Sequence, residues 1–320
     1  MHIETTWVVY LVAFICKDFA GYCTHRLAHT VNYFWNRHLV HHSSEEFNLP
    51  CALRQSVSIH LFMQFWYHTQ YIPKLGFLEY IIITPSQHRV HHAINPVYLD
   101  KNMGQIFCVW DRMFGTFQEE LDDVPPVYGI TRPVKTWNPI KINFQHLGLL
   151  FTDAWRSENW LHKLTIWFKP LGWRPPDVIA KYPVAKIEDV NNFVKYNTNP
   201  STGLTAWAWF QFSVVSTLIL YMFYQFTNIG MPMLFVYGSF LVLSIYGFTT
   251  LMDKDWLALP IEIARSVLGC GFVLYTGGWF GIETFVPFAD LAVFIYFFVT
   301  ALGTLYFVNE IKTEQQLEVG

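Results

Sequence analysis

The chain has 320 residues, of which 52% are hydrophobic, 18% aromatic and only 14% charged. This composition excludes an ordinary soluble domain, because a water-soluble protein of this length needs a larger share of charged residues. The formal net charge of −3 and the lack of any basic run argue against a nucleic-acid partner.

The first predicted element is an apolar helix over residues 7–23, which carries Lys17 and Asp18 near its end. No basic start or small-residue cleavage site precedes it, so we do not expect a cleaved signal peptide. Asp18 lies seven residues before His25, and the two therefore share a helix face. A carboxylate inside an apolar helix is costly and is usually functional. We expect Asp18 to accept a hydrogen bond from His25, with a snorkelling charge or a pair with Lys17 as the alternative.

Nine of the chain's 13 histidines form one spacing pattern after this helix begins. The pattern is HxxxH, then two copies of HxxHH with one further histidine between them: His25, His29, His38, His41, His42, His68, His88, His91 and His92. On a helix, residues three or four apart point the same way, so each motif presents its imidazoles together. Nine imidazoles exceed what one tetrahedral zinc can use. The pattern predicts two metal ions held side by side, with positions left for oxygen or substrate.

Other polar residues near these motifs carry weaker signals. Asn95 and Asp100 follow the second HxxHH copy, where they either close the site over its ligands or cap the next helix. A zinc protease of the HExxH class is excluded, because the chain contains no such string. The histidines without a partner pattern are expected to be loop or interfacial residues: His60, His146 and His162.

The rest of the chain predicts an all-α, multi-pass membrane protein in three parts. Residues 1–117 are the histidine-rich core, and residues 118–203 are a proline-broken polar cap with short helices, such as one over residues 144–157. Residues 204–320 contain a four-helix transmembrane bundle and a polar tail. The expected spans of this bundle lie at residues 204–226, 231–251, 256–275 and 285–308, with Trp and Tyr crowded at their ends.

Basic residues are unevenly distributed along the chain. Eighteen of the 21 Lys and Arg precede residue 200. By the positive-inside rule, the histidine cluster and the cap should face the cytosol. We therefore expect an integral membrane protein of the bacterial inner membrane or the endoplasmic reticulum, with its two-metal site at the cytosolic face.

Three strings around the histidines resemble those of a known family. They are HHSSEEFNLPCALRQS over residues 41–56, QFWYHTQ over residues 64–70, and TPSQHRVHHAINPVYLDKNMGQIFCVWDRMFGTF over residues 84–117. With the histidine spacing, they resemble the fatty acid hydroxylase/sterol desaturase superfamily of membrane diiron oxygenases. Within it, the alkylglycerol monooxygenase group and its bacterial sterol-desaturase-like relatives are the most similar. The resemblance covers essentially the whole chain, and it implies that the nine histidines bind two iron ions.

The resemblance also implies a reaction. It predicts a monooxygenase that hydroxylates a C–H bond of a lipid with O2, and cleaves an ether lipid if the likeness to the subgroup holds. A sterol or fatty acid hydroxylase or desaturase shares the metal chemistry and stays open as an alternative. Because no GxGxxG, Walker A or CxxCH string is present, the electrons must come from outside the chain. The resemblance implies a reduced pterin of the tetrahydrobiopterin kind, or a small electron-donor protein.

The chain departs from the family pattern near the middle of the histidine region. Relatives carry an apolar stretch there, roughly long enough for a helical hairpin, whereas Ser56 and Gln64 are separated by only seven residues. Relatives also have further apolar segments before the helix that leads to His25, and tend to have Glu at the position of Gln70. A second interpretation, from a different class, is therefore a non-catalytic membrane protein that keeps the metal site.

Overall fold

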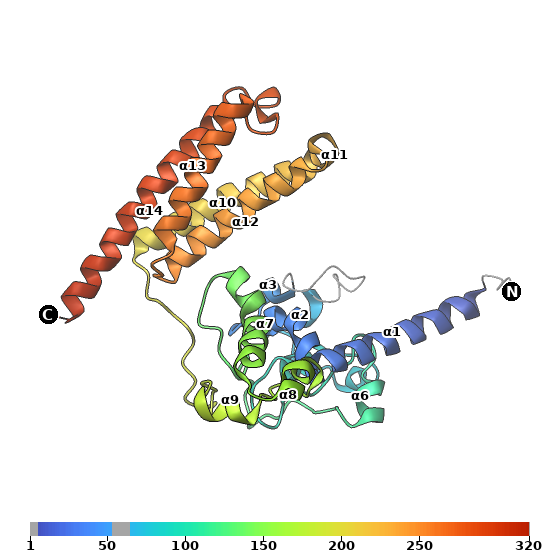
Figure 1. The fold of residues 1–320 in the computed structure, drawn as a ribbon. Coiled ribbons are helices and arrows are strands. Elements are labelled where there is room, and N and C mark those ends of the chain that lie inside the picture. Colours follow the sequence, from blue (N-terminus) through green and yellow to red (C-terminus); the bar gives the residue numbers. More distant parts are fainter. Residues whose placement is uncertain (1–5, 53–64, 320) are drawn as a thin grey trace. The chain divides into compact units, whose positions relative to one another are not determined.

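The structure is a computed structural model that describes residues 6–52 and 65–319. The described residues form α-helices and short 3-10 helices (Figure 1), with isolated β-bridges and no β-strand among them. The predicted all-α class is confirmed. The shortened join between Ser56 and Gln64, and His60 within it, lie outside the described residues.

The chain divides into two compact units. One comprises Met1–Lys135 and Ile142–Tyr196, and contains the histidine motifs; we call it the histidine unit. The other comprises Thr136–Lys141 and Asn197–Gly320, and we call it the bundle unit. Most of the segment expected to form a separate cap therefore packs with the histidine motifs in one unit.

The histidine unit is built from short helices around the end of one long helix. Its elements are α1 (Trp7–Thr30), α2 (Asn32–His42), α3 (Leu49–Ala52), η1 (Gly76–Tyr80), α5 (Pro85–His91), α6 (Val109–Phe114), α7 (Pro139–Arg156, whose first three residues belong to the bundle unit), α8 (Trp160–Thr165), η2 (Ile166–Phe168) and α9 (Pro176–Lys181). Local chemistry sets several of their ends. Thr84 caps α5 by accepting from the Gln87 amide, and Pro85 occupies the first turn. Gly115 ends α6 in the left-handed region, at φ 73°.

Asn32 fastens α2 to the rest of the histidine unit. Its side chain is fully buried and donates to the carbonyls of Ile166 and Trp173, both at 3.0 Å. The Gly172 amide donates to its Oδ1 at 3.0 Å. His146 lies 3.1 Å from the Asn32 carbonyl, which gives this histidine a structural contact away from the metal motifs. One buried amide thus fixes the start of α2 against two later segments.

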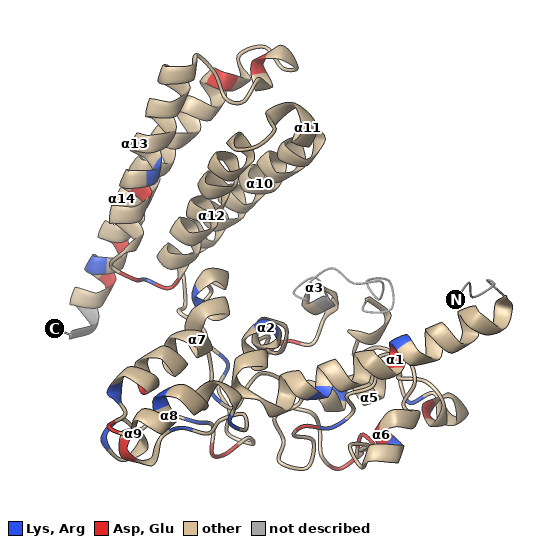
Figure 2. Cartoon of the chain, turned by 45° about the vertical axis from the view of Figure 1, so that its right-hand side comes forward, with Lys and Arg blue, Asp and Glu red and all other residues tan. Residues whose placement is uncertain are grey.

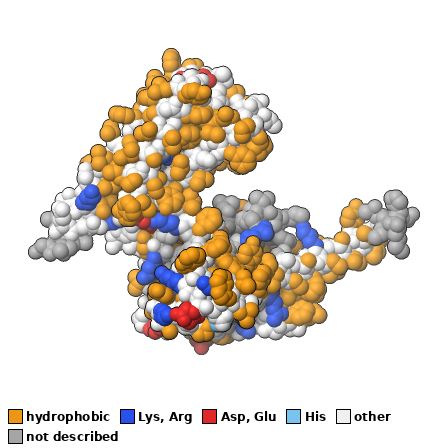
Figure 3. All heavy atoms as spheres, viewed as in Figure 1, with side chains coloured by type: hydrophobic (Ala, Val, Ile, Leu, Met, Phe, Trp, Pro, Cys, Tyr) orange, Lys and Arg blue, Asp and Glu red, His pale blue; other side chains and the backbone are white. Residues whose placement is uncertain are grey.

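Apolar side chains of η1 and α6 are exposed beside the middle of α1. The most exposed are Phe77, at 73%, and Met113, at 66%. Phe19 of α1 packs against Trp110 and Phe114, with ring centroids 4.9 and 5.9 Å apart. Together with the exposed apolar side chains of α1 itself (Figure 3), this surface suits lipid rather than water.

The bundle unit contains four long apolar helices. They are α10 (Thr202–Tyr224), α12 (Met233–Met252), α13 (Ala258–Thr276) and α14 (Ala289–Val319), with the short α11 (Phe226–Ile229) and η3 (Ile282–Thr284) between them. With α1, they make five helices that are long and apolar enough to cross a membrane. Only 17–44% of the most apolar window of each bundle helix is buried, so most of their apolar side chains point outward. The predicted long apolar helices are confirmed, and these five candidate spans indicate an integral membrane protein.

Charged residues are sparse along these long helices (Figure 2). Glu262 and Arg265 of α13 are buried, and their side chains bond to each other. Arg265 also donates to Ser244 Oγ at 3.1 Å and to Thr300 Oγ1 at 2.6 Å. The pair therefore joins α12, α13 and α14 by hydrogen bonds. Charged residues inside a membrane bundle are expected to be paired in this way, so we interpret the pair as structural.

Candidate metal centre

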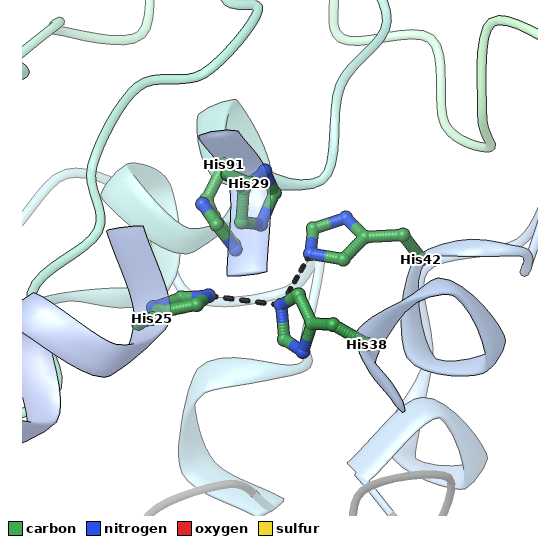
Figure 4. A group of neighbouring side chains, drawn as sticks. All are labelled: His25, His29, His38, His42 and His91. Carbon is green, nitrogen blue, oxygen red and sulfur yellow. Dashed lines mark hydrogen bonds between the residues drawn. The ribbon is translucent and has the colours of Figure 1, made fainter. Parts of the chain in front are cut away.

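The structure brings all nine histidines of the predicted pattern together in two groups. The first group is His25, His29, His38, His42 and His91, and the second is His41, His68, His88 and His92. Within each group, one ligand nitrogen from every residue lies within 4.8 Å of the others. Figure 4 shows the five rings of the first group turned toward one another. Because imidazole suits iron, zinc and copper, each group can hold one metal ion.

Helical geometry explains why each HxxHH motif contributes to both groups. Successive residues turn by about 100°, so residues i and i+4 are about 40° apart, whereas neighbours are about 100° apart. In α2, His38 and His42 form the i, i+4 pair of the first group, and His41 turns to the second. In α5 and its C-cap, His88 and His92 form the pair of the second group, and His91 turns to the first. The two motifs are therefore crossed, and each helix links both metal positions.

The spacing of the ring nitrogens fits a metal ion in each group. In the first group, Nε2 of His38 lies 2.9 Å from Nε2 of His25 and 3.0 Å from Nε2 of His42. In the second, Nε2 of His68 lies 3.0–3.3 Å from the Nε2 atoms of three partners: His41, His88 and His92. Nitrogens bound to one ion at about 2.1 Å, at angles between 90° and tetrahedral, are about 3.0–3.4 Å apart. The rings are therefore already at ligand spacing.

Two further ring nitrogens point to the same conclusion. Nε2 of His29 and Nε2 of His91 are buried and have no hydrogen-bond partner among the described residues. Buried polar atoms are normally paired, so each such atom needs an explanation. A metal ion in the first group would satisfy both of them.

The opposite ring nitrogens hold the imidazoles in place. Nδ1 of His25 lies 2.8 Å from the Met103 carbonyl, and Nδ1 of His91 lies 2.9 Å from the Lys101 carbonyl. Nδ1 of His41 lies 3.0 Å from the Cys51 carbonyl. A carbonyl can only accept, so these Nδ1 atoms carry the protons and donate them. Each Nε2 is therefore left as a free lone pair, which is the tautomer that a metal needs.

Burial keeps these histidines neutral. Burial lowers the pKa of six histidines, in α2 and in and after α5, to well below the usual range, and the charges of neighbouring histidines lower it further. The six are His38, His41, His42, His88, His91 and His92. A protonated imidazole cannot bind a metal. The site therefore offers its ligands in the metal-binding form at neutral pH.

The expected contact between Asp18 and His25 is wrong. Asp18 is 2% exposed, and its carboxylate accepts from the amides of Ile106 and Phe107, at 3.0 and 3.3 Å, and from the Trp110 indole at 2.8 Å. The shared helix face brought Asp18 toward the loop that contains the acceptor of His25, Met103, and not to the imidazole itself. Asp18 therefore binds the segment that follows Met103, at Ile106, Phe107 and Trp110.

The other two predicted residues outside the ligand set are Asp100 and Asn95, and their contacts differ. Asp100 Oδ1 is 3.3 Å from His29 Nδ1, although the Asp100 side chain is 62% exposed. Asn95 accepts from the Val127 amide at 2.8 Å and donates to the Pro125 carbonyl at 3.1 Å. The segment that Asn95 bonds to also carries Tyr128, whose ring stacks on the Phe47 ring with the centroids 5.0 Å apart. This contact agrees with the interpretation that Asn95 helps to close the site.

Sequence patterns missed several residues that shape the centre. Phe47 packs against His68 and His92, with ring centroids 5.3 Å from each. The contact of Gln70 was also not predicted: its side chain donates to the Phe47 carbonyl at 3.0 Å and so supports this wall. Asp111 accepts from the Met103 and Gly104 amides at 2.7 and 2.8 Å, which fixes the carbonyl that orients His25. A backbone carbonyl that accepts a hydrogen bond from a histidine leaves no residue-type signal in a sequence.

Comparisons with known proteins agree with this geometry. Residues 10–62 and 52–116 match the family model described as fatty acid hydroxylase. Alkylglycerol monooxygenase of Homo sapiens is 33% identical over 291 residues, which cover 83% of this chain and 65% of that protein. The Xenopus tropicalis protein of that name is 31% identical over the same shares, and the Danio rerio protein is 39% identical over 198 residues, 54% of this chain and 44% of that protein. The chain thus spans less than two thirds of the length of these relatives. No solved structure matches the chain significantly.

Proposed function

Because this chain carries a fatty acid hydroxylase domain and is a homologue of the alkylglycerol monooxygenases, we propose that it is a diiron monooxygenase that hydroxylates a C–H bond of a membrane lipid. The observation that carries the proposal is the convergence of nine neutral imidazoles into two groups at ligand spacing. The first group would hold one iron and the second group the other. When bound, iron supplies the activation of O2 that C–H hydroxylation requires.

The chain's own residues hold, orient and shield this centre. Carbonyls of Cys51, Lys101 and Met103 keep three of the rings in one tautomer. Phe47 and Tyr67 pack on the second group and limit the access of water; the Tyr67 ring lies 5.4 Å from the His88 ring. A dry, fixed set of ligands favours a controlled oxidation over loss of the oxidant to solvent.

The substrate class follows from the names of the relatives. We propose an ether lipid, attacked at the carbon next to the ether oxygen. One atom of O2 enters the C–H bond, and the other leaves as water with two electrons and two protons from an external reductant. The resulting hemiacetal breaks its C–O bond to give an aldehyde and a glycerol derivative. The reductant would be a reduced pterin or a small electron-donor protein.

The membrane setting supports lipid access to the site. His25 and His29 lie in the last turns of α1, which is itself a candidate span, so the first group sits where this apolar helix ends. A lipid chain can reach the centre from the bilayer without crossing water. The excess of Lys and Arg before residue 200 supports a cytosolic position for the centre.

Aerobic incubation of the purified full chain with a lipid panel and a reduced pterin tests the proposal. We expect an aldehyde from an alkylglycerol, detected by mass spectrometry and absent without O2. Conversion of a sterol or a fatty acid instead would favour the alternative hydroxylase or desaturase. Two bound irons without any O2-dependent product would favour the non-catalytic interpretation. The short join at Ser56–Gln64, and Gln70 at the position where relatives are expected to have Glu, support that interpretation.

A further inference from the structure

A cavity of about 400 Å³ lies beside the first histidine group. Its wall includes His29, His42 and His91, so it opens onto the position of the first metal. The rest of the wall comes from α2, the segment at residues 92–100, α7, the segment at residues 129–132 and the segment at residues 171–186. A volume of this size suits a small organic ligand or a large part of a lipid.

Besides Nε2 of His29 and Nε2 of His91, two buried polar atoms in this wall have no hydrogen-bond partner among the described residues. They are Nη1 of Arg132 and Oε1 of Gln145. A second arginine of the same wall differs in this respect: Arg174 donates from Nε and Nη2 to the two carboxylate oxygens of Asp153, at 2.5 and 2.9 Å. Asp153 is therefore already engaged in a bidentate pair, and Arg132 has a donor left over.

The surroundings of Arg132 disfavour its positive charge. Burial lowers the pKa of the Arg132 guanidinium, and the charge of Arg174 lowers it further, against a smaller opposing effect of Asp153. A guanidinium stays protonated in proteins, so the unfavourable charge is relieved by an anionic or oxygen-rich partner rather than by proton loss. The exposed Lys186 adds a third cation to the same wall, beside Arg132 and Arg174.

The remaining wall is mainly apolar, and its carboxylate, Asp100, lies 3.3 Å from Nδ1 of His29. The wall includes Leu39, Leu149 and Leu171 beside the Trp35 ring, which packs 5.1 Å from the His29 ring. A ligand that fits has an anionic group for Arg132 and an apolar portion that runs toward the histidines. A phosphate-bearing lipid has both parts, whereas a free phosphate ion has only the first.

We propose that this cavity is the head-group chamber of the lipid substrate, and that Arg132 selects a phosphate-bearing head group over an uncharged one. This inference rests on the proposed function for the identity of the lipid, but concerns binding alone. The guanidinium would donate from Nη1 to a phosphate oxygen, and Gln145 would accept from a hydroxyl of the glycerol. The carbon next to the ether oxygen would then lie between Arg132 and the first histidine group.

Binding measurements on the full chain in detergent micelles, without O2 and without reductant, test this inference independently of turnover. The probes are 1-O-hexadecylglycerol 3-phosphate, uncharged 1-O-hexadecylglycerol and inorganic phosphate. We expect the phosphate-bearing lipid to bind at least about 10-fold more tightly than the uncharged lipid, as one charge-assisted contact provides. In Arg132→Gln this preference should disappear. In the matched control Arg156→Gln, which removes an exposed arginine of the same unit outside the cavity, it should remain.

Three results would overturn the inference. They are equal binding of the two lipids by the parent chain, an unchanged preference in Arg132→Gln, and inorganic phosphate that binds as tightly as the phosphate-bearing lipid. If Arg132→Gln does not fold, the second variant is Arg132→Lys, which keeps the positive charge but lacks the planar guanidinium. Its preference should then be reduced but present, and a full preference in this variant would contradict a role for the guanidinium. Loss of turnover with intact head-group selection would count against the proposed reaction and not against this site.

Discussion

Replacement of Asp18 by alanine tests how the membrane helix α1 is coupled to the metal centre. The Asp18 carboxylate accepts three hydrogen bonds from the loop at residues 106–110 and is almost fully buried. Each buried donor left without an acceptor costs about 1–3 kcal/mol. Because the three donors share one loop and can partly relax together, we expect Asp18→Ala to cost about 3–5 kcal/mol in local stability.

The effect should reach the metal through Met103. The loop that Asp18 holds continues into the segment whose Met103 carbonyl accepts from His25. Loss of a group that orients a metal ligand typically costs about 10–100-fold in metal affinity. We therefore expect Asp18→Ala to lower both the thermal midpoint and the iron affinity, measured by chelator competition. Asp18→Asn, which keeps one accepting oxygen, should lie between this variant and the parent.

The exposed residue Asp122 provides the matched control. Its side chain is 93% exposed and forms an ion pair with the surface residue Lys74, so Asp122→Ala should leave iron affinity and thermal midpoint unchanged. Asp18→Ala with the iron affinity of the parent would refute the proposed path from Asp18 through the loop to His25. Lower stability with unchanged iron affinity would restrict Asp18 to packing.

The remaining predictions concern the metal, the pH dependence and the topology. Purified protein should contain close to two irons per chain by elemental analysis. His91→Ala in the first group and His41→Ala in the second should each lower this content, whereas the control His162→Ala should not. The metal-free protein should lose thermal stability as the pH falls below about 6.5, because the unfolded chain then binds protons that the buried histidines, with their lowered pKa, do not; a midpoint constant between pH 7.5 and 5 would contradict this. Cysteines placed at Lys101 and Lys135 should be labelled from the same side of the membrane, the cytosolic one, and labelling from opposite sides would refute the topology.

The sequence predicted the elements whose signal is local. Apolar stretches of spanning length gave the five candidate spans, since a helix that faces lipid must be apolar along its whole length. The histidine spacing predicted that the nine imidazoles would meet. It did not predict the crossed arrangement in which His41 and His91 leave their own motifs for the opposite group. That outcome depends on how α2 and α5 face each other, which no spacing within one helix determines.

Contacts between distant segments were not predictable for the same reason. Helical periodicity placed Asp18 on the face of His25, but the loop from residue 103 to residue 110 returns to this face and takes the carboxylate. Asn32 likewise shows no motif, although its amide joins α2 to segments more than 130 residues later. Apart from the Trp110 indole, the groups that Asp18 and Asn32 contact here are backbone groups, which are the same at every position of a sequence.

The crossed motifs have a consequence for the chemistry of the centre. Because α2 and α5 each supply ligands to both groups, a shift of either helix changes both metal positions together. The two helices are held from outside by different anchors, Asn32 for α2 and the Thr84 cap for α5. The long helix α1 contributes only to the first group, the one beside the cavity and Asp100. The first metal position is therefore the one that a lipid bound near α1 can influence. The second, enclosed by Phe47 and Tyr67, is coupled to the first through the shared helices.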